Sequence, residues 1–198
     1  MTRQRMSLRE RQQEQARREI VSAALQLISA EGTEAITIDR LSVEANMARA
    51  TLYARFPDGL DAIIAAAYAA VSDQITQSSA AAISPGSAWD ESMLAWAQCF
   101  VDVSAQPGIG RFYNVVGPRM NAAGQVVGRG SEATMAAFEQ LLGRAVGEGA
   151  LPADAPVQAL AVMLVGALRE SGMAIARGSV TAEQALTSFS WLLQRLSR

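Results

Sequence analysis

Segment 48–56, with the sequence ARATLYARF, gathers side chains that can bind nucleic acid within roughly two and a half helical turns. The candidates are Arg49, Thr51, Tyr53 and Arg55. An arginine can hydrogen bond guanine edges or phosphate, a threonine can contact a thymine methyl, and a tyrosine can reach a phosphate oxygen. Leu52 and Phe56 are spaced i, i+4, which places them on one side of the helix and predicts that this side faces the core. A helix this short is only marginally stable by itself, so the pattern indicates a helix that the rest of the protein holds in place while its polar side contacts a partner.

Two absent residue types exclude several kinds of catalytic chemistry. The chain has no histidine, and all 17 basic residues are arginine. Catalytic triads, imidazole metal ligands, Schiff-base lysines and P-loop lysines are therefore excluded, and we expect no metal site and no cofactor. An all-helical enzyme that uses Asp, Glu, Tyr or Arg is the least favoured alternative, because no constellation of these residues is recognisable.

Cysteine usage and hydropathy indicate a compartment. The single cysteine, Cys99, rules out an internal disulfide, and no apolar segment follows the basic N-terminus as in a secretory signal. The longest apolar runs, 62–71 and 159–168, have ten residues each. That is half of the ~20 residues that a bilayer-spanning helix requires. We expect a cytoplasmic protein without a membrane segment.

The 198 residues are 50% hydrophobic and only 18% charged, and their apolar positions recur every three or four residues. This periodicity predicts an all-α protein of about nine helices. The expected helices span about 12–30, 37–45, 48–56, 58–82, 87–106, 109–120, 131–147, 155–176 and 181–196.

The predicted organisation has three parts: a flexible arginine-rich arm at 1–11, a DNA-binding domain at 12–57, and a larger helical domain at 58–198. The first 55 residues hold nine arginines against seven acids, whereas the rest hold eight against twelve. This asymmetry is a weak sign that the N-terminal part contacts a polyanion. We expect Asp58 to cap the long fourth helix, which then connects the two domains.

Helices 37–45 and 48–56 follow a helix-turn-helix pattern, in which the second helix enters the major groove. Thr37 is a suitable N-cap, and Asn46 tolerates the positive φ expected at the turn. The inward residues are Leu41, Ala45, Met47 and Leu52. Many αα-hairpins bury the same pattern, so a purely structural role is the alternative.

Motifs between Ile20 and Ala67 resemble the DNA-binding domain of TetR-family transcriptional regulators. They are I-x-x-A-A-x-x-L-I-x-x-x-G at 20–32, L-S-x-x-A at 41–45 and A-T-L-Y-A-R-F at 50–56. The resemblance implies that Thr37 contacts phosphate, that Arg49, Ala50 and Thr51 lie at the bases, and that Tyr53 and Arg55 grip the backbone. The chain departs from the family pattern at Asn46, Ala48, Ala50 and Gly59, and Gly59 stands where a lysine is usual.

The larger domain resembles the ligand-binding and dimerisation domain of the same family. Bulky residues that would line a cavity for an apolar or aromatic effector are Trp89, Trp96, Phe100, Phe112, Tyr113, Met120, Phe138 and Met163. Arg169 and Glu170 follow an apolar run and would orient a polar group of the ligand if they point inward. The alternative is that the bulky residues form plain core and that the charged pair lies on an interface rim.

The last two helices are the candidates for a homodimer interface, through Ala159, Met163, Ala167, Phe189, Trp191, Leu192 and Leu196. A symmetric dimer would bind a palindromic operator in double-stranded DNA. The favoured interpretation is a ligand-responsive repressor. The alternative is a TetR-like protein that binds a small molecule or partner without useful DNA affinity.

Overall fold

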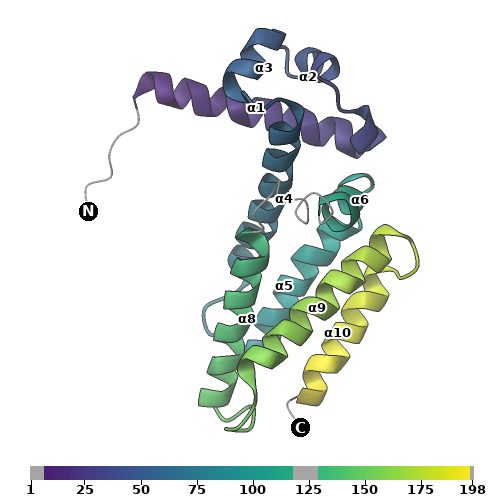
Figure 1. Cartoon of the computed structure of the whole chain (residues 1–198). Coiled ribbons are helices and arrows are strands. Elements are labelled where there is room, and N and C mark those ends of the chain that lie inside the picture. The colour runs from purple at the N-terminus through teal and green to yellow at the C-terminus, as the bar shows by residue number, and fades with distance from the viewer. Residues whose placement is uncertain (1–6, 118–128, 197–198) are drawn as a thin grey trace.

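The computed structural model describes residues 7–117 and 129–196, with the backbone alone at 129–131. Over these ranges the chain is helical and forms no strand, as expected for an all-α protein. In Figure 1, α1, α2 and α3 form a group at one end, α4 leads away from it, and α5, α8, α9 and α10 form a bundle. The elements are α1 (Leu8–Glu31), η1 (Thr33–Ala35), α2 (Ile38–Glu44), α3 (Arg49–Arg55), α4 (Leu60–Ala82), α5 (Trp89–Ser104), α6 (Ile109–Arg111), η2 (Phe112–Val116), α8 (Arg129–Gly147), α9 (Val157–Ala176) and α10 (Ala182–Leu196).

The first helix begins at Leu8, so the prediction of a flexible arm up to residue 11 was wrong for its last four residues. Ser7 and Glu10 form a reciprocal capping box: the Glu10 amide donates to Ser7 Oγ at 3.2 Å, and the Ser7 amide donates to the Glu10 carboxylate at 2.7 Å. Two of the four orphan amide groups are thereby satisfied, which allows the helix to start this early. Residues 1–6 lie outside the described residues.

The turn between α2 and α3 has the predicted geometry. Thr37 caps α2, because its hydroxyl accepts the Arg40 amide hydrogen at 3.2 Å. Asn46 has a φ of +50°, and the Met47 amide donates to the Ser42 carbonyl at 3.0 Å to close the turn. Ala48 precedes α3 without a side-chain cap.

The long helix α4 begins after Gly59 and not, as predicted, with a cap from Asp58. Gly59 has a φ of +71°, and its amide donates to the Phe56 carbonyl at 2.9 Å. A left-handed backbone is easily reached by glycine, so the turn is made by backbone geometry, and no side chain caps the helix.

Two groups of buried residues hold the molecule together. The N-terminal core joins α1, α2, α3 and the first two-thirds of α4 to parts of α5, α6 and η2, and the bundle core joins α5, α8, α9 and α10. Phe100 packs against both cores. Because α4 leaves the N-terminal core and runs alongside α5 and α8, the two ends share a continuous helix.

The predicted helix at 109–120 takes another form in its described part. Three α-helical residues are followed by a π-helical turn at Phe112–Val116. The buried Asn114 amide donates to Ser104 Oγ at 3.1 Å and to the Gly110 carbonyl at 2.9 Å. Further along the chain, Thr181 and Gln184 form the predicted capping box of α10, with hydrogen bonds of 2.9 and 3.1 Å.

Candidate nucleic-acid interface

The outward side of α3 carries the polar residues singled out in the sequence. In Figure 1, α3 lies on the side of α1 that faces away from the bundle. Arg49 and Ala50 are exposed, Tyr53 is 49% exposed, and Thr51 and Arg55 are half-buried. The structure therefore brings these five residues together on one short helix, as predicted.

Buried leucines support this face from beneath. Leu41 of α2 and Leu52 of α3 are both fully buried, and Phe56 closes the end of α3 with its ring in the N-terminal core. Met47 and Ala45 pack against the same core. A helix of seven residues is thus fixed by apolar contacts that leave its polar side open to solvent.

Arg49 is held by an acid of the neighbouring helix. Its guanidinium lies 2.8 Å from the Asp39 carboxylate, and both side chains are largely exposed. An exposed ion pair contributes little to stability. The pair therefore costs little to break, and Arg49 can exchange Asp39 for a phosphate or base.

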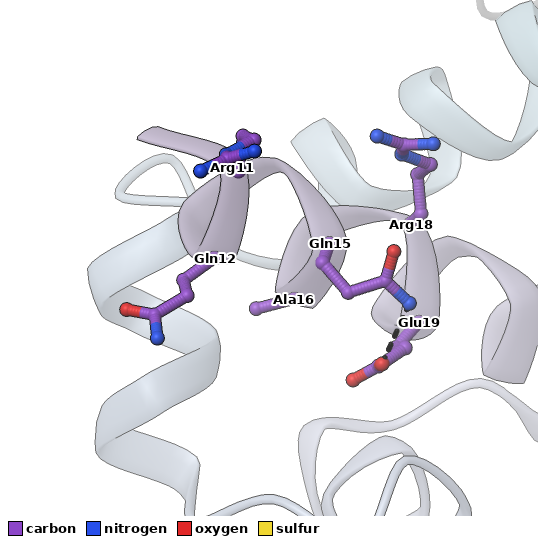
Figure 2. A pocket seen from close by; sticks show the side chains of 6 residues that line it. All are labelled: Arg11, Gln12, Gln15, Ala16, Arg18 and Glu19. Atoms are coloured by element: carbon purple, nitrogen blue, oxygen red, sulfur yellow. Dashed lines mark hydrogen bonds between the residues drawn. The ribbon is translucent and has the colours of Figure 1, made fainter. Parts of the chain in front are cut away.

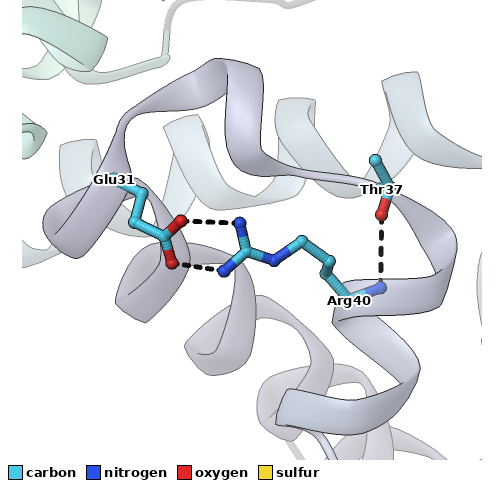
Figure 3. Close-up of polar contacts among 3 residues, drawn as sticks. All are labelled: Glu31, Thr37 and Arg40. Carbon is cyan, nitrogen blue, oxygen red and sulfur yellow. Dashed lines mark hydrogen bonds and ion pairs between the residues drawn. The ribbon is translucent and has the colours of Figure 1, made fainter.

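The start of α2 is tied to the end of α1 by an arginine that the sequence analysis did not single out. The Arg40 guanidinium donates two hydrogen bonds to the Glu31 carboxylate, while the Arg40 amide donates to Thr37 (Figure 3). The Arg40 hydrogen bond holds the pKa of Glu31 below its usual value, and Glu31 in turn raises the pKa of Arg40. A glutamate nine residues before an arginine has no helical spacing, so only the folded chain brings the two together.

An arginine of α1 contacts the C-terminal end of α3. Arg17 Nη1 donates to the carbonyl of Arg55, and the Arg17 guanidinium carbon lies 4.1 Å from the centroid of the Phe56 ring. Sequence analysis missed this contact too, because Arg17 has the pattern of an ordinary solvated helix residue.

The exposed beginning of α1 carries a shallow depression of about 470 Å³, lined by Arg11, Gln12, Gln15, Ala16, Arg18 and Glu19 (Figure 2). Gln15 donates to Glu19 at 2.8 Å across its floor. The Arg18 guanidinium is 3.7 Å from Glu14 in an exposed pair, and Arg11 forms no ion pair with any described residue. This wide, polar surface can attract anions, but it has no enclosed space for a ligand.

The residues predicted to line an effector cavity do not meet in one place. Trp89, Trp96 and Phe138 lie in the bundle core, Phe112 lies in the N-terminal core, and Met120 is outside the described residues. Met163 and Glu170 are exposed on α9, on the side away from the aromatic residues predicted to line the cavity with them. Arg169 is exposed as well, but its charge acts on Tyr68 and Tyr113, so it lies near the aromatic residues between the two cores. The spacing of Met163 and Glu170 on α9 turns them away from the bundle core, whose α9 contacts come from Ala161, Leu164, Val165 and Leu168.

Phe100 and Tyr113 remain as aromatic candidates between the two cores. Their ring centroids are 6.3 Å apart in an edge arrangement, and the Tyr113 ring stacks on Tyr68 at 4.9 Å. Ser72 Oγ lies 3.2 Å from the Tyr113 hydroxyl. Burial raises the pKa of Tyr68 to about 12 and also raises that of Tyr113, so both hydroxyls stay protonated near neutral pH.

The outer side of α9 and α10 is apolar. Met163 is 69% exposed, Val162 and Trp191 are each 58% exposed, and Leu192 is exposed as well. Among the predicted interface residues, Ala159 is exposed and Ala167 and Leu196 are half-buried. The prediction that Phe189 belongs to the interface was wrong, because its side chain is 5% exposed and packs against Phe138 in the bundle core. Val162 was missed because helical spacing did not show which side of an almost wholly apolar helix is covered.

Of the described helices, α9 is the one whose length and apolar composition would allow it to cross a membrane. It packs against α5, α8, α10 and η2, and only part of its surface is buried by them. This composition follows from a helix that is apolar both toward the bundle core and on its outer side.

Comparison with known proteins assigns residues 20–67 to the N-terminal domain of the tetR family of bacterial regulatory proteins. A TetR-family regulator from Rhodococcus sp. superposes with a TM-score of 0.75 at 14% identity, over 93% of this chain and 100% of the other. A TetR-family regulator from Pectobacterium atrosepticum gives 0.69 at 20% identity, over 96% and 95%. RolR in complex with resorcinol gives 0.65 at 15% identity, over 94% and 89%. Comparison with curated protein sequences finds no match.

Proposed function

We propose that the chain is a TetR-type repressor that binds a palindromic operator as a homodimer and is released by a small effector. The match of residues 20–67 to the N-terminal domain of the tetR family and the shared fold support this proposal. A protein of this family is a transcription factor and not an enzyme. The observation that carries the proposal is the outward side of α3, where polar side chains stand on a base of buried leucines.

In this proposal Arg49, Ala50 and Thr51 lie at the base edges, and Tyr53 and Arg55 contact the phosphate backbone. Thr37 caps α2 and lies close enough to its N-terminus to bind a phosphate as well. Arg49 leaves Asp39 when DNA binds, because a carboxylate beside the phosphates would be repelled.

The homodimer is supported by the outer apolar face of α9 and α10, which we define by Val162, Met163, Trp191 and Leu192. Large exposed apolar patches mark interaction sites. A two-fold axis through this face would pair the two helices of each protomer into a four-helix interface. Residues up to 57 would then bind DNA, and residues 58–198 would bind the effector and the partner protomer.

The effector is expected to be small and largely apolar or aromatic. RolR, which shares the fold, was solved with resorcinol. In this chain Phe100 and Tyr113 lie where the two cores meet, and α4 passes the same place on its way to the DNA-binding end. A ligand wedged there would shift α4 and change the separation of the two α3 helices, which lowers operator affinity. A regulator of this kind acts in the cytoplasm, where the DNA is.

Gly59 motivates a second candidate, a small-molecule-binding protein without useful DNA affinity. The family usually has a lysine at this position, and here the backbone has a φ of +71°, which favours glycine. One phosphate contact fewer reduces the salt dependence of binding by about one unit of slope and leaves the binding mode intact. Arg9 and Arg11 at the start of α1 can supply the missing charge, so the repressor is the favoured function.

The test is a selection of random duplex DNA on the purified protein, followed by titration of the enriched sequence at two salt concentrations. We expect an inverted repeat whose half-sites are about 34 Å apart or a multiple of that distance. Arg49→Ala and Tyr53→Ala should bind it more weakly, by about tenfold each, because each removes a base or phosphate contact.

Arg177→Ala is the matched control, since it removes one exposed arginine at the C-terminal end of α9, outside the helix-turn-helix. Its operator affinity should equal that of the wild type. If no sequence is enriched even at low salt, the repressor proposal fails and the second candidate takes its place. The enriched duplex then serves as the probe for release by small aromatic compounds.

A further inference from the structure

The ends of α3 are unequally supported. At its N-terminus Ala48 offers no side-chain acceptor, so the first amide groups of the helix have no cap from a side chain. At its C-terminus the last carbonyl groups have no partner within the helix. With seven residues, α3 cannot fix its own direction, and the direction of a recognition helix decides which base edges its side chains reach.

Arg17 supplies the contact at the C-terminal end. Its guanidinium donates to the carbonyl of Arg55, the last residue of α3, and lies 4.1 Å from the ring centroid of Phe56, which is 2% exposed. A cation at a helix C-terminus is favoured by the helix dipole, and a guanidinium above an aromatic face gains a cation–π contact. Through these two contacts, the Arg17 side chain of α1 holds the last backbone carbonyl of α3 and the buried Phe56 ring that follows the helix.

The chemistry requires an arginine. The planar guanidinium can stack on a ring and donate along its edge at the same time, whereas the ammonium of lysine is a point charge without a plane. Arg17 forms no ion pair with any described residue, so its position is set by the carbonyl and the ring. Arg17 and the neighbouring Arg18 are both exposed, but they differ in partner: the Arg18 guanidinium lies 3.7 Å from Glu14, one turn away on the same helix.

We propose that Arg17 is a positioning residue for DNA recognition, which clamps the C-terminal end of α3 and so sets the direction of Arg49, Ala50 and Thr51 toward the bases. The proposal rests on the proposed function, because it assumes that α3 reads DNA. It assigns to Arg17 a role in sequence discrimination that a phosphate-neutralising charge would not have.

The experiment compares Arg17→Lys and Arg17→Ala with Arg18→Lys and Arg18→Ala in the full chain. Each is titrated with the enriched duplex and with a scrambled duplex of the same length, at two salt concentrations. We expect both Arg17 variants to lose about tenfold in affinity for the enriched duplex. Arg17→Lys should keep the affinity for the scrambled duplex and the salt slope, because its charge is unchanged. The Arg18→Lys variant should keep the ratio of the two affinities.

A second readout needs no DNA. Hydrogen exchange at the amides of residues 52–56 should be faster in both Arg17 variants than in the wild type or in Arg18→Lys, because the end of α3 frays without the clamp. Unchanged exchange in Arg17→Ala would overturn the clamp.

Two further outcomes separate the proposals. Full specific affinity in Arg17→Lys, with loss in Arg17→Ala, would show that Arg17 acts as a phosphate contact and would overturn the positioning role. Failure of the wild type to bind any duplex would overturn the proposed function, and with it the recognition role of Arg17. An unchanged affinity ratio in the variants of a DNA-binding wild type would overturn the Arg17 role alone.

Discussion

The outward sides of α3 and α9 both face solvent in the single chain, but they differ in chemistry. On α3 the exposed residues include Arg49 and Tyr53, which water solvates well. On α9 they include Val162 and Met163, which water solvates poorly. Burial of apolar surface contributes about 25 cal/mol per Å², so contact with another apolar surface would stabilise the outward side of α9. The outward side of α3 would be stabilised by contact with an anion. We infer that the two ends of the molecule bind partners of different kinds: a polyanion at α3 and a second apolar surface at α9.

The two ends are also supported differently. The bundle core packs four long helices against one another, whereas α3 depends on a few leucines, Phe56 and the Arg17 contact. A substitution that disturbs packing where the two ends meet is therefore expected to lower the free energy of unfolding most. The smaller effects are expected at single polar contacts.

The largest expected effect is at Gly108, where the loop before α6 passes α1. A Cβ atom there would lie 2.2 Å from the Ile28 carbonyl oxygen and 2.9 Å from Ser29 Cα, and the φ of Gly108 is +70°. Gly108→Ala should lower the free energy of unfolding by about 3 kcal/mol, through left-handed strain and overpacking together. Denaturant unfolding measures this loss.

Gly149→Ala is the control, because Gly149 has a φ of +74° and no atom within 4 Å of the added Cβ. It should cost only the backbone strain, about 1 kcal/mol. Equal losses at the two glycines would contradict the close contact between the ends of the molecule.

The next effect is on the outer apolar face. If the proposed homodimer forms through this face, Met163→Glu should weaken it at least about 100-fold, because a carboxylate would be buried without a partner. Sedimentation velocity over a range of protein concentrations measures the dissociation constant. Gln77→Glu, on the exposed side of α4, adds the same charge elsewhere and should leave the dimer intact. A dimer of undiminished affinity in Met163→Glu would place the interface on another surface.

A smaller effect distinguishes two threonines with the same structural role. The Thr37 hydroxyl caps α2 by accepting the Arg40 amide hydrogen at 3.2 Å. The Thr181 hydroxyl caps α10 by accepting the Gln184 amide hydrogen at 3.1 Å. Either change to alanine should cost about 1 kcal/mol of stability. Only Thr37→Ala should also weaken operator binding, measured by titration at a temperature where both variants are fully folded. An equal loss of DNA affinity in Thr181→Ala would mean that stability alone explains the effect.

The last effect is absent at neutral pH and appears only at alkaline pH. Burial raises the pKa of Tyr68 to about 12 from 10.0, and raises that of Tyr113 as well. The unfolded chain therefore loses these protons first, so stability is full below pH 10 and falls as the pH rises toward about 12. Denaturant unfolding across this range should show a shallower fall in Tyr68→Phe.

Local signals in the sequence predicted the helix-turn-helix well. The Thr37 cap, the positive φ of Asn46 and the capping box of Thr181 and Gln184 are confirmed. Each depends on residues close together in the chain, so neighbouring side chains suffice to predict it. The start of α1 at Leu8 could also have been predicted from neighbouring residues, since Ser7 and Glu10 have the spacing of a capping box. The many arginines around them suggested a flexible arm instead.

Contacts between distant segments were not predictable in the same way. The periodicity of α10 marks Phe189, Leu192 and Leu196 alike as apolar, yet Phe189 is buried in the bundle core and Leu192 is exposed. The clamp between Arg17 and Arg55 joins residues 38 positions apart. No spacing rule connects such residues, because their distance is set by how α1 and α3 pack.

By itself the sequence determined that the chain is helical, where most helices begin and end, and which short helix carries the polar probe. Those properties follow from periodicity and capping, which act over a few residues. Only the tertiary structure decided which bulky residues fill the cores, which side of α9 stays uncovered, and which arginine of α1 contacts the end of α3. Exposure and long-range contact depend on the relative placement of whole helices, and that placement is the result of packing all of them at once.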